Sequence, residues 1–171
     1  MRIYIPATLS MLQQLVADGS LRPVSGTAFA VTPKLREAYA EGDDDELGEV
    51  ALREAALASL RLLAGAADDS GQPGDGLPPR RAVLVADVGD VTLRPDLDDA
   101  VVRIGGPVIS DDVVAAFVDN PAAEAKVKDA IAVIDAADLG DEDAELTVGD
   151  AQDHDLAWYA VQELPFLLEL L

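Results

Sequence analysis

Cysteine is absent from this 171-residue chain, and histidine and tryptophan occur once each. Without cysteine there are no disulfides, no thiolate zinc site and no cysteine nucleophile. No serine lies in a G-x-S-x-G motif, and neither G-x-x-x-x-G-K-[ST] nor G-x-G-x-x-G occurs. The sequence therefore lacks the usual signatures of serine hydrolases and phosphate-binding loops. It predicts no catalytic residue and no cofactor.

Long apolar runs are also missing. No segment approaches the roughly 20 apolar residues of a membrane-spanning helix. Residues 1–12 contain neither the apolar core nor the cleavage site of a secretory signal. We therefore expect a cytoplasmic protein that makes no membrane contact.

Positive charge is scarce and unevenly distributed. The formal net charge is −21, and residues 138–171 hold ten acidic side chains and no basic one. Such a surface repels phosphates, which argues against direct binding of nucleic acid. A protein partner with a basic surface or a cation fits better. The alternative is that the charge serves solubility alone.

Hydrophobic periodicity predicts alternating strands and helices. Thr8 and Gly19 are typical of the start and end of a helix, Thr32-Pro33 of a second start, and Asp43 of a third. The predicted strands are 2–5, 27–31, 82–88, 100–104, 113–118 (with a helix as the alternative) and 156–160, and the predicted helices are 8–18, 33–39, 44–66, 121–139 and 162–170.

This pattern predicts an α+β fold with a mixed β-sheet and helices packed mainly on one face, close to an elaborated ferredoxin-like arrangement. Residues 67–79 are rich in glycine, proline and aspartate and predict a flexible loop. Because little chain lies on either side of that loop, we expect residues 1–171 to form a single domain.

The acidic stretch 138–155 and the aromatic segment after it contain the residues that we predict to bind a partner. They are Asp141, Glu142, Asp143, Glu145, His154 and Trp158. Trp158 and Tyr159 are neighbours in a predicted strand, so their side chains point to opposite faces of the sheet. One of them can therefore be exposed and anchor a partner.

Three of these carboxylates are also weak candidates for a metal site. Asp141, Asp143 and Glu145 have the i, i+2, i+4 spacing that calcium loops use, and hard cations prefer oxygen ligands. An EF-hand would need glycine and glutamate where Leu146 and Gln152 stand. Weak Mg²⁺ or Ca²⁺ binding is therefore the only metal chemistry that the spacing supports.

Several segments together resemble a family of small actinobacterial proteins of unknown function. They are RIYIPATLSML, GTAFAVTP, the helix ASLRLLA and GDEDAELTVGDAQDHDLAWYAVQELPFLL. The resemblance covers nearly the whole chain. It implies a free-standing cytoplasmic domain and supplies no activity or catalytic residues.

The leading hypothesis is a non-enzymatic binding or regulatory module that engages a basic protein partner through its acidic C-terminal third. The alternative is a divalent-metal-dependent hydrolase that uses the carboxylates of residues 138–155. A third option is an acidic protein that mimics DNA. The apolar C-terminal segment ELPFLLELL either docks on its own domain or forms a homodimer contact.

Overall fold

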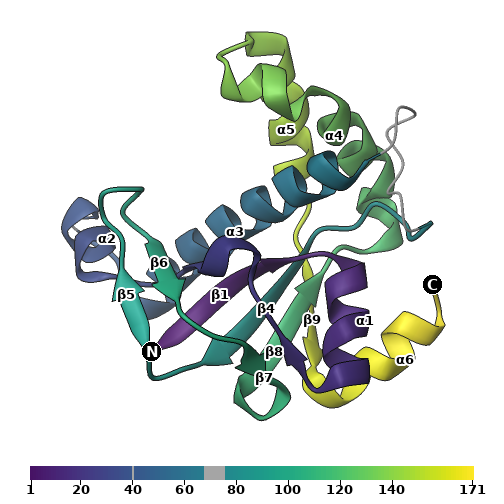
Figure 1. The fold of residues 1–171 in the computed structure, drawn as a ribbon. Helices are drawn as coiled ribbons and strands as arrows, with labels where there is room; N and C mark the ends of the chain where they lie inside the picture. Colours follow the sequence, from purple (N-terminus) through teal and green to yellow (C-terminus); the bar gives the residue numbers. More distant parts are fainter. Residues whose placement is uncertain (40, 68–75) are drawn as a thin grey trace.

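The computed structural model describes residues 1–39, 41–67 and 76–171 (Figure 1). Seven strands of this described part form one sheet in the order β5-β6-β3-β1-β4-β8-β9. They are β1 (Arg2–Ala7), β3 (Thr27–Phe29), β4 (Ala82–Asp87), β5 (Val91–Leu93), β6 (Val101–Ile104), β8 (Val113–Val118) and β9 (Ala157–Ala160). Strands from both sides of residues 67–79 thus interleave in the same sheet.

Every described pairing in this sheet is antiparallel. The α+β class is confirmed. The sequence predicted a mixed sheet, and the described strands of this sheet pair in the antiparallel direction. A second sheet pairs β2 (Ser20–Leu21) with β7 (Val108–Ile109). Two- and three-residue strands such as β2, β5 and β7 are too short to give a periodic signal, which is why the sequence did not predict them.

The helices are α1 (Leu9–Asp18), α2 (Pro33–Ala38), α3 (Asp44–Ala66), α4 (Glu124–Asp138), α5 (Glu142–Gln152) and α6 (Leu164–Glu169). Short 3₁₀ turns occupy Val24–Gly26, Ser110–Asp112, Pro121–Ala123 and Val161–Glu163. None of the helices in the described part of the chain is long and apolar enough to cross a membrane.

Three of the predicted helix starts are confirmed. The Thr8 side chain accepts a hydrogen bond from the Met11 N–H, and Thr32 and Asp43 cap α2 and α3 in the same way. Gly19 ends α1 in the left-handed conformation, with φ 74°, which glycine adopts without steric cost. The segment 113–118 is a strand, and most of the predicted loop 67–79 lies outside the described residues.

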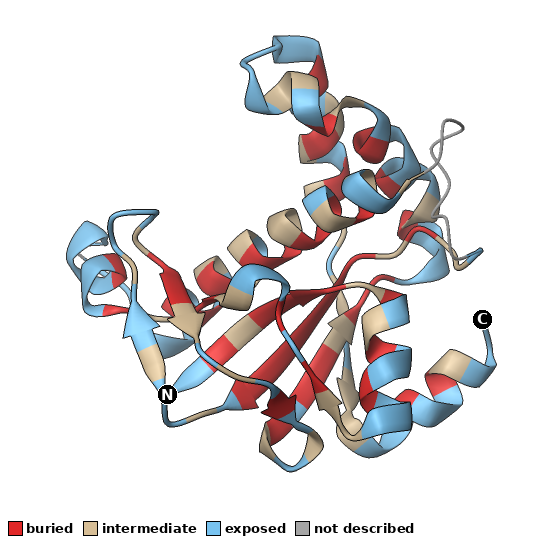
Figure 2. Cartoon of the chain, viewed as in Figure 1, coloured by how far each residue is buried: buried red, intermediate tan, exposed pale blue. Residues whose placement is uncertain are grey.

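Helices cover both faces of the sheet rather than mainly one (Figures 1 and 2). On one face Ile3, Ile5 and Leu84 pack against α1 and α6. On the other face Val83 packs beneath α3. The physical reason is that the central strand β4 is buried along Ala82–Ala86, so both of its faces must be covered.

The acidic stretch 138–155 holds a helix, α5, that the sequence did not predict. Its buried positions are Ala144, Val148 and Ala151, which follow helical spacing but are small. Val148 and Ala151 pack with Val127 of α4 and Leu63 of α3 in a third apolar cluster. A buried face made largely of alanine gives a weak hydrophobic signal, so the surrounding carboxylates dominated the prediction.

The α4–α5 hairpin is held to α3 by an ion pair. Arg61 donates to both carboxylate oxygens of Asp138, at 3.0 and 2.9 Å. The hydrogen bond from Arg61 lowers the pKa of Asp138 below its usual value. Both side chains remain more than 40% exposed, with 47% and 42% of their surface accessible, so water screens the pair.

We expect Asp138→Asn to lower the free energy of unfolding by up to about 1 kcal/mol at neutral pH. Because the folded-state pKa is depressed, the contribution is complete above the unfolded pKa of aspartate and is lost as pH falls through the folded value. Urea unfolding at several pH values should show the two proteins converging in acid. Asp135→Asn, at an exposed residue of α4 with no described ion pair, is the control.

Candidate functional site

The β9 strand forms one end of the main sheet and leaves one of its edges open. It pairs with β8 from Ala157 to Ala160, and no other strand of the described part of the chain pairs with it. The Ala160 N–H donates to Glu163 Oε1 at 2.9 Å, so it points away from β8. Alternate residues of a strand direct their backbone groups to the same side. The N–H and C=O of Trp158 therefore also point to the open edge.

The two aromatic residues of β9 lie on opposite faces of the sheet, as the sequence predicted. Tyr159 packs against the apolar cluster beneath α1 and α6. Trp158 lies on the α3 side, opposite Phe117 of β8, and 58% of its surface is exposed. Its indole is thus presented beside an open strand edge.

A groove runs between α3 and this end of the sheet. It consists of two adjoining hollows of about 400 and 220 Å³ that share Glu49 and Leu52 of α3. We call it the α3–β9 groove. Its lining comprises Arg2, Tyr4, Asp44, Asp45, Gly48, Glu49, Leu52, Arg53, Ala56, Arg81, Val85, Val114, Ala115, Phe117, Gln152, His154, Asp155, Leu156 and Trp158.

Close helix packing shapes the floor of the groove. A Cβ atom at Gly48 would lie 2.9 Å from the Tyr4 hydroxyl oxygen, so glycine lets the phenol approach α3. The Tyr4 phenol is protonated at neutral pH, as tyrosine ordinarily is, and burial raises its pKa further. The floor is therefore uncharged at this point.

The rim of the groove is negatively charged. Asp45, Glu49 and Asp155 are exposed and form no ion pair within the described part of the chain. Arg53 is the one lining cation that lacks such a pair there, because the other two arginines are paired with aspartates: Arg2 with Asp87 and Arg81 with Asp119. Three unpaired carboxylates against one unpaired guanidinium favour a cationic ligand.

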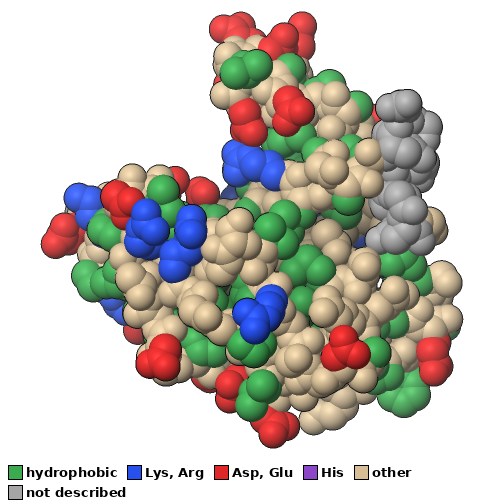
Figure 3. Space-filling model, viewed as in Figure 1, with side chains coloured by type: hydrophobic (Ala, Val, Ile, Leu, Met, Phe, Trp, Pro, Cys, Tyr) green, Lys and Arg blue, Asp and Glu red, His purple; other side chains and the backbone are tan. Residues whose placement is uncertain are grey.

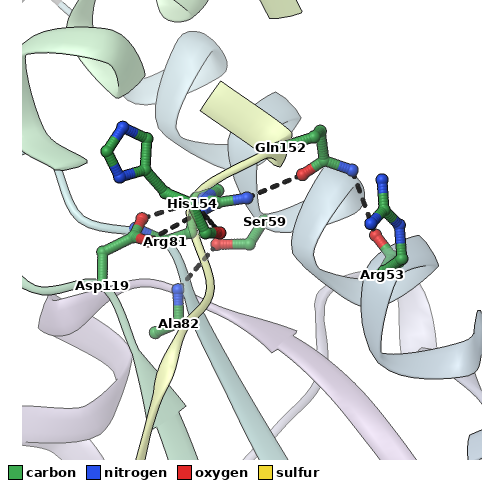
Figure 4. Close-up of polar contacts among 7 residues, drawn as sticks. All are labelled: Arg53, Ser59, Arg81, Ala82, Asp119, Gln152 and His154. Atoms are coloured by element: carbon green, nitrogen blue, oxygen red, sulfur yellow. Dashed lines mark hydrogen bonds and ion pairs between the residues drawn. The ribbon is translucent and has the colours of Figure 1, made fainter. Parts of the chain in front are cut away.

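A buried ion pair anchors the wall of the groove where α5 leads into β9 (Figure 4). Arg81 is 1% exposed and Asp119 is fully buried. The Arg81 Nε and Nη2 groups donate to Asp119 Oδ2 and Oδ1 at 2.8 and 2.7 Å, a bidentate arrangement. The backbone N–H of Arg81 also donates to Asp119 Oδ2. This pair joins the residue before β4 to the residue after β8.

The same guanidinium holds the chain between α5 and β9. Its Nη1 donates to Gln152 Oε1 at 2.7 Å, and its Nη2 donates to the backbone oxygen of His154 at 2.8 Å. The imidazole of His154 makes no hydrogen bond with the residues drawn in Figure 4. His154 thus contributes its backbone to this network, and the residue lines the groove at a half-buried position.

Ser59 is a structural residue in the same region. Its hydroxyl donates to the Ala7 oxygen at 2.7 Å and accepts from the Ala82 N–H at 3.0 Å. Ala7 and Ala82 face each other at the end of the β1–β4 ladder. Ser59 therefore joins α3 to two central strands at a fully buried position.

The six predicted partner-binding residues fall into two groups at opposite ends of α5. Asp141 caps α5 by accepting from the Ala144 N–H at 2.9 Å, and Glu142, Asp143 and Glu145 are exposed in its first turn. Figure 3 shows acidic side chains gathered at the tip of this projecting hairpin. His154 and Trp158 lie beyond the other end of α5, about 15 Å away along the helix.

The hairpin carboxylates have a local explanation that the sequence did not reveal. Acidic side chains at a helix N-terminus stabilise the helix through its macrodipole. Across the described ranges, no group of three or more histidine, cysteine, aspartate or glutamate residues is arranged to hold a metal ion. One carboxylate oxygen of Asp141 is also occupied by the helix cap.

Sequence reasoning missed Arg81, Asp119, Glu49 and Leu52. Arg81 directly precedes the apolar run of β4, and Asp119 directly follows that of β8. Charged residues bordering two buried strands were a signal for a buried pair, since antiparallel neighbours bring such ends together. Glu49 and Leu52 gave no comparable signal, because their role depends on how α3 crosses the sheet.

The chain belongs to a family of unknown function, DUF6912, whose family model matches residues 1–168. This confirms the predicted membership in a family of unknown function. No curated protein and no solved structure matches the chain.

Proposed function

We propose that this protein is a non-enzymatic binding module that holds a basic segment of a protein partner in the α3–β9 groove. The observation that carries the proposal is the exposed Trp158 beside an open strand edge and an acidic groove. Partly exposed aromatic residues next to hollows are frequent energetic anchors of protein interfaces. The unpaired carboxylates of Asp45, Glu49 and Asp155 supply complementary charge.

This proposal moves the binding surface from the acidic stretch 138–155 as a whole to its C-terminal end and to α3. His154 and Trp158 stay in the proposed surface. Asp141, Glu142, Asp143 and Glu145 are assigned to helix stabilisation at the hairpin tip. No arrangement of carboxylates in the described part of the chain favours the metal-dependent hydrolase.

We also propose that residues 1–171 act as one domain. The main sheet supports this, because it combines strands from before and after residues 67–79. The sequence resemblance supports a cytoplasmic location in an actinobacterium. The net charge of −21 supports binding of a protein rather than direct binding of nucleic acid.

Trp158 is the only tryptophan of the chain and therefore reports on the groove directly. We expect its fluorescence to shift to the blue when it is titrated with twelve-residue peptides in which pairs of lysine or arginine alternate with pairs of valine or leucine, because a bound peptide removes the indole from water. In an extended peptide of this pattern each face presents both basic and apolar side chains. Peptides with glutamate at the basic positions are the matched control. No shift at millimolar basic peptide, or equal binding of the acidic set, would overturn the proposal.

A further inference from the structure

We infer that the partner segment binds as an added strand on the open edge of β9, with Trp158 as its anchor. This inference rests on the proposed function and specifies how the groove is used. An extended peptide that joins a sheet edge gains main-chain hydrogen bonds, while alternate side chains enter pockets beside the sheet.

The backbone of β9 is arranged for one added strand. The outward N–H and C=O of Trp158 have no strand partner in the described ranges, as derived above from the direction of the Ala160 N–H. Because the Ala160 N–H already donates to Glu163, the added strand ends beside Ala160. Arg81 fixes the other limit by holding the His154 oxygen. The open edge therefore spans residues 156–160, about 17 Å of extended chain.

The side chains beside the edge select the sequence of the added strand. A residue directly across from Trp158 has its Cβ about 5 Å away and lies on the groove side of the sheet. An apolar residue at that position packs on the exposed indole. Basic side chains two positions before or after that residue point to the same groove side, where Glu49 and Asp155 lie.

Charge argues against a second copy of this chain as the occupant. Pairing of two β9 strands would bring Glu49 and Asp155 of one copy toward the same carboxylates of the other. Each copy also carries a net charge of −21, so their association is opposed by long-range repulsion. A basic extended segment of another protein meets the same edge with favourable charge.

The test compares Trp158→Ala with Trp158→Pro, using the polarisation of a fluorescently labelled lysine–valine peptide. Alanine removes only the indole, whereas proline removes the indole and the outward N–H. Proline is tolerated at this position because the lost N–H does not belong to the β8 ladder. We expect about a tenfold loss of affinity for Trp158→Ala and a further loss of about fivefold for Trp158→Pro.

Two further measurements complete the test. Urea unfolding should show both variants folded, and Tyr159→Pro should be much less stable, because its N–H points into the ladder with β8. Amide hydrogen exchange on the wild-type protein should show the Trp158 N–H protected by the unlabelled peptide and unprotected without it.

The outcomes separate this inference from the proposed function. If Trp158→Pro binds as well as Trp158→Ala and the Trp158 amide stays unprotected, the peptide occupies the groove without joining the sheet, and the inference is wrong. If Trp158→Ala binds like the wild type, the proposed groove itself is wrong. Protection of the Trp158 amide that rises with protein concentration alone would identify a second copy as the occupant and overturn the inference.

Discussion

Replacing Arg81 by methionine is expected to lower the free energy of unfolding by about 3–5 kcal/mol. Asp119 is fully buried, and in this variant its carboxylate loses both guanidinium hydrogen bonds. The acceptors on Gln152 and His154 also lose their donor. A buried charge without a partner is far more unfavourable than a buried pair, so most of the loss comes from Asp119.

A second substitution and a neighbouring control make this prediction specific. Arg81→Met combined with Asp119→Asn should recover more than half of the loss, because the amide is uncharged and still accepts from the backbone N–H of residue 81. Arg80→Met removes a more exposed pair, with Glu124, and should lower stability by only about 1 kcal/mol. Urea unfolding measures all three. Equal effects of the Arg80 and Arg81 variants would contradict the buried network.

Ser59→Ala is expected to lower the free energy of unfolding by about 1–3 kcal/mol, although it deletes a single oxygen atom. The hydroxyl satisfies the Ala7 oxygen and the Ala82 N–H at once, in a position that water does not reach. Both backbone groups would be left with unmet hydrogen-bonding capacity at the end of the β1–β4 ladder.

The control for Ser59 is Ser10→Ala, at an exposed position of α1. Because Ser10 faces water, its substitution should change stability by no more than about 0.5 kcal/mol. Thermal or urea unfolding of the two variants distinguishes the roles of the two serines. A Ser59 variant as stable as the Ser10 variant would show that α3 does not depend on this contact.

Local chemistry predicted much of the secondary structure. Thr8 and Gly19 bound α1 as expected, and Asp43 begins α3, because caps and turns depend on residues next to each other in the chain. The strand β4 was predicted from an unbroken apolar run. The helix α5 was missed because its buried face consists of Ala144, Val148 and Ala151.

The candidate site was only partly predictable, because it depends on strand order. The sequence predicted that Trp158 and Tyr159 face opposite sides, but which of them is exposed depends on where α1, α3 and α6 pack. The sequence alone could not show that β9 ends the sheet. It also could not show that Glu49, which is far from β9 in the sequence, lies in the same groove as Trp158.

The most direct test of the account compares two triple variants that each remove three carboxylates. One changes the groove, by Asp45→Asn, Glu49→Gln and Asp155→Asn. The other changes the hairpin tip, by Asp141→Asn, Asp143→Asn and Glu145→Gln. Asparagine replaces aspartate as the helix cap at residue 141, where it caps about equally well. Both variants keep Trp158 as the fluorescent reporter, and both change the net charge equally.

We predict that the groove variant binds the lysine–valine peptide about tenfold more weakly than the wild type, since each lost ion pair contributes roughly 0.2–1 kcal/mol. The hairpin variant should bind within about twofold of the wild type. Its charges lie about 15 Å from the groove, which exceeds the Debye length of about 8 Å at physiological salt, so their effect there is largely screened. Weaker binding by the hairpin variant than by the groove variant would contradict the account and place the partner at the tip of the α4–α5 hairpin.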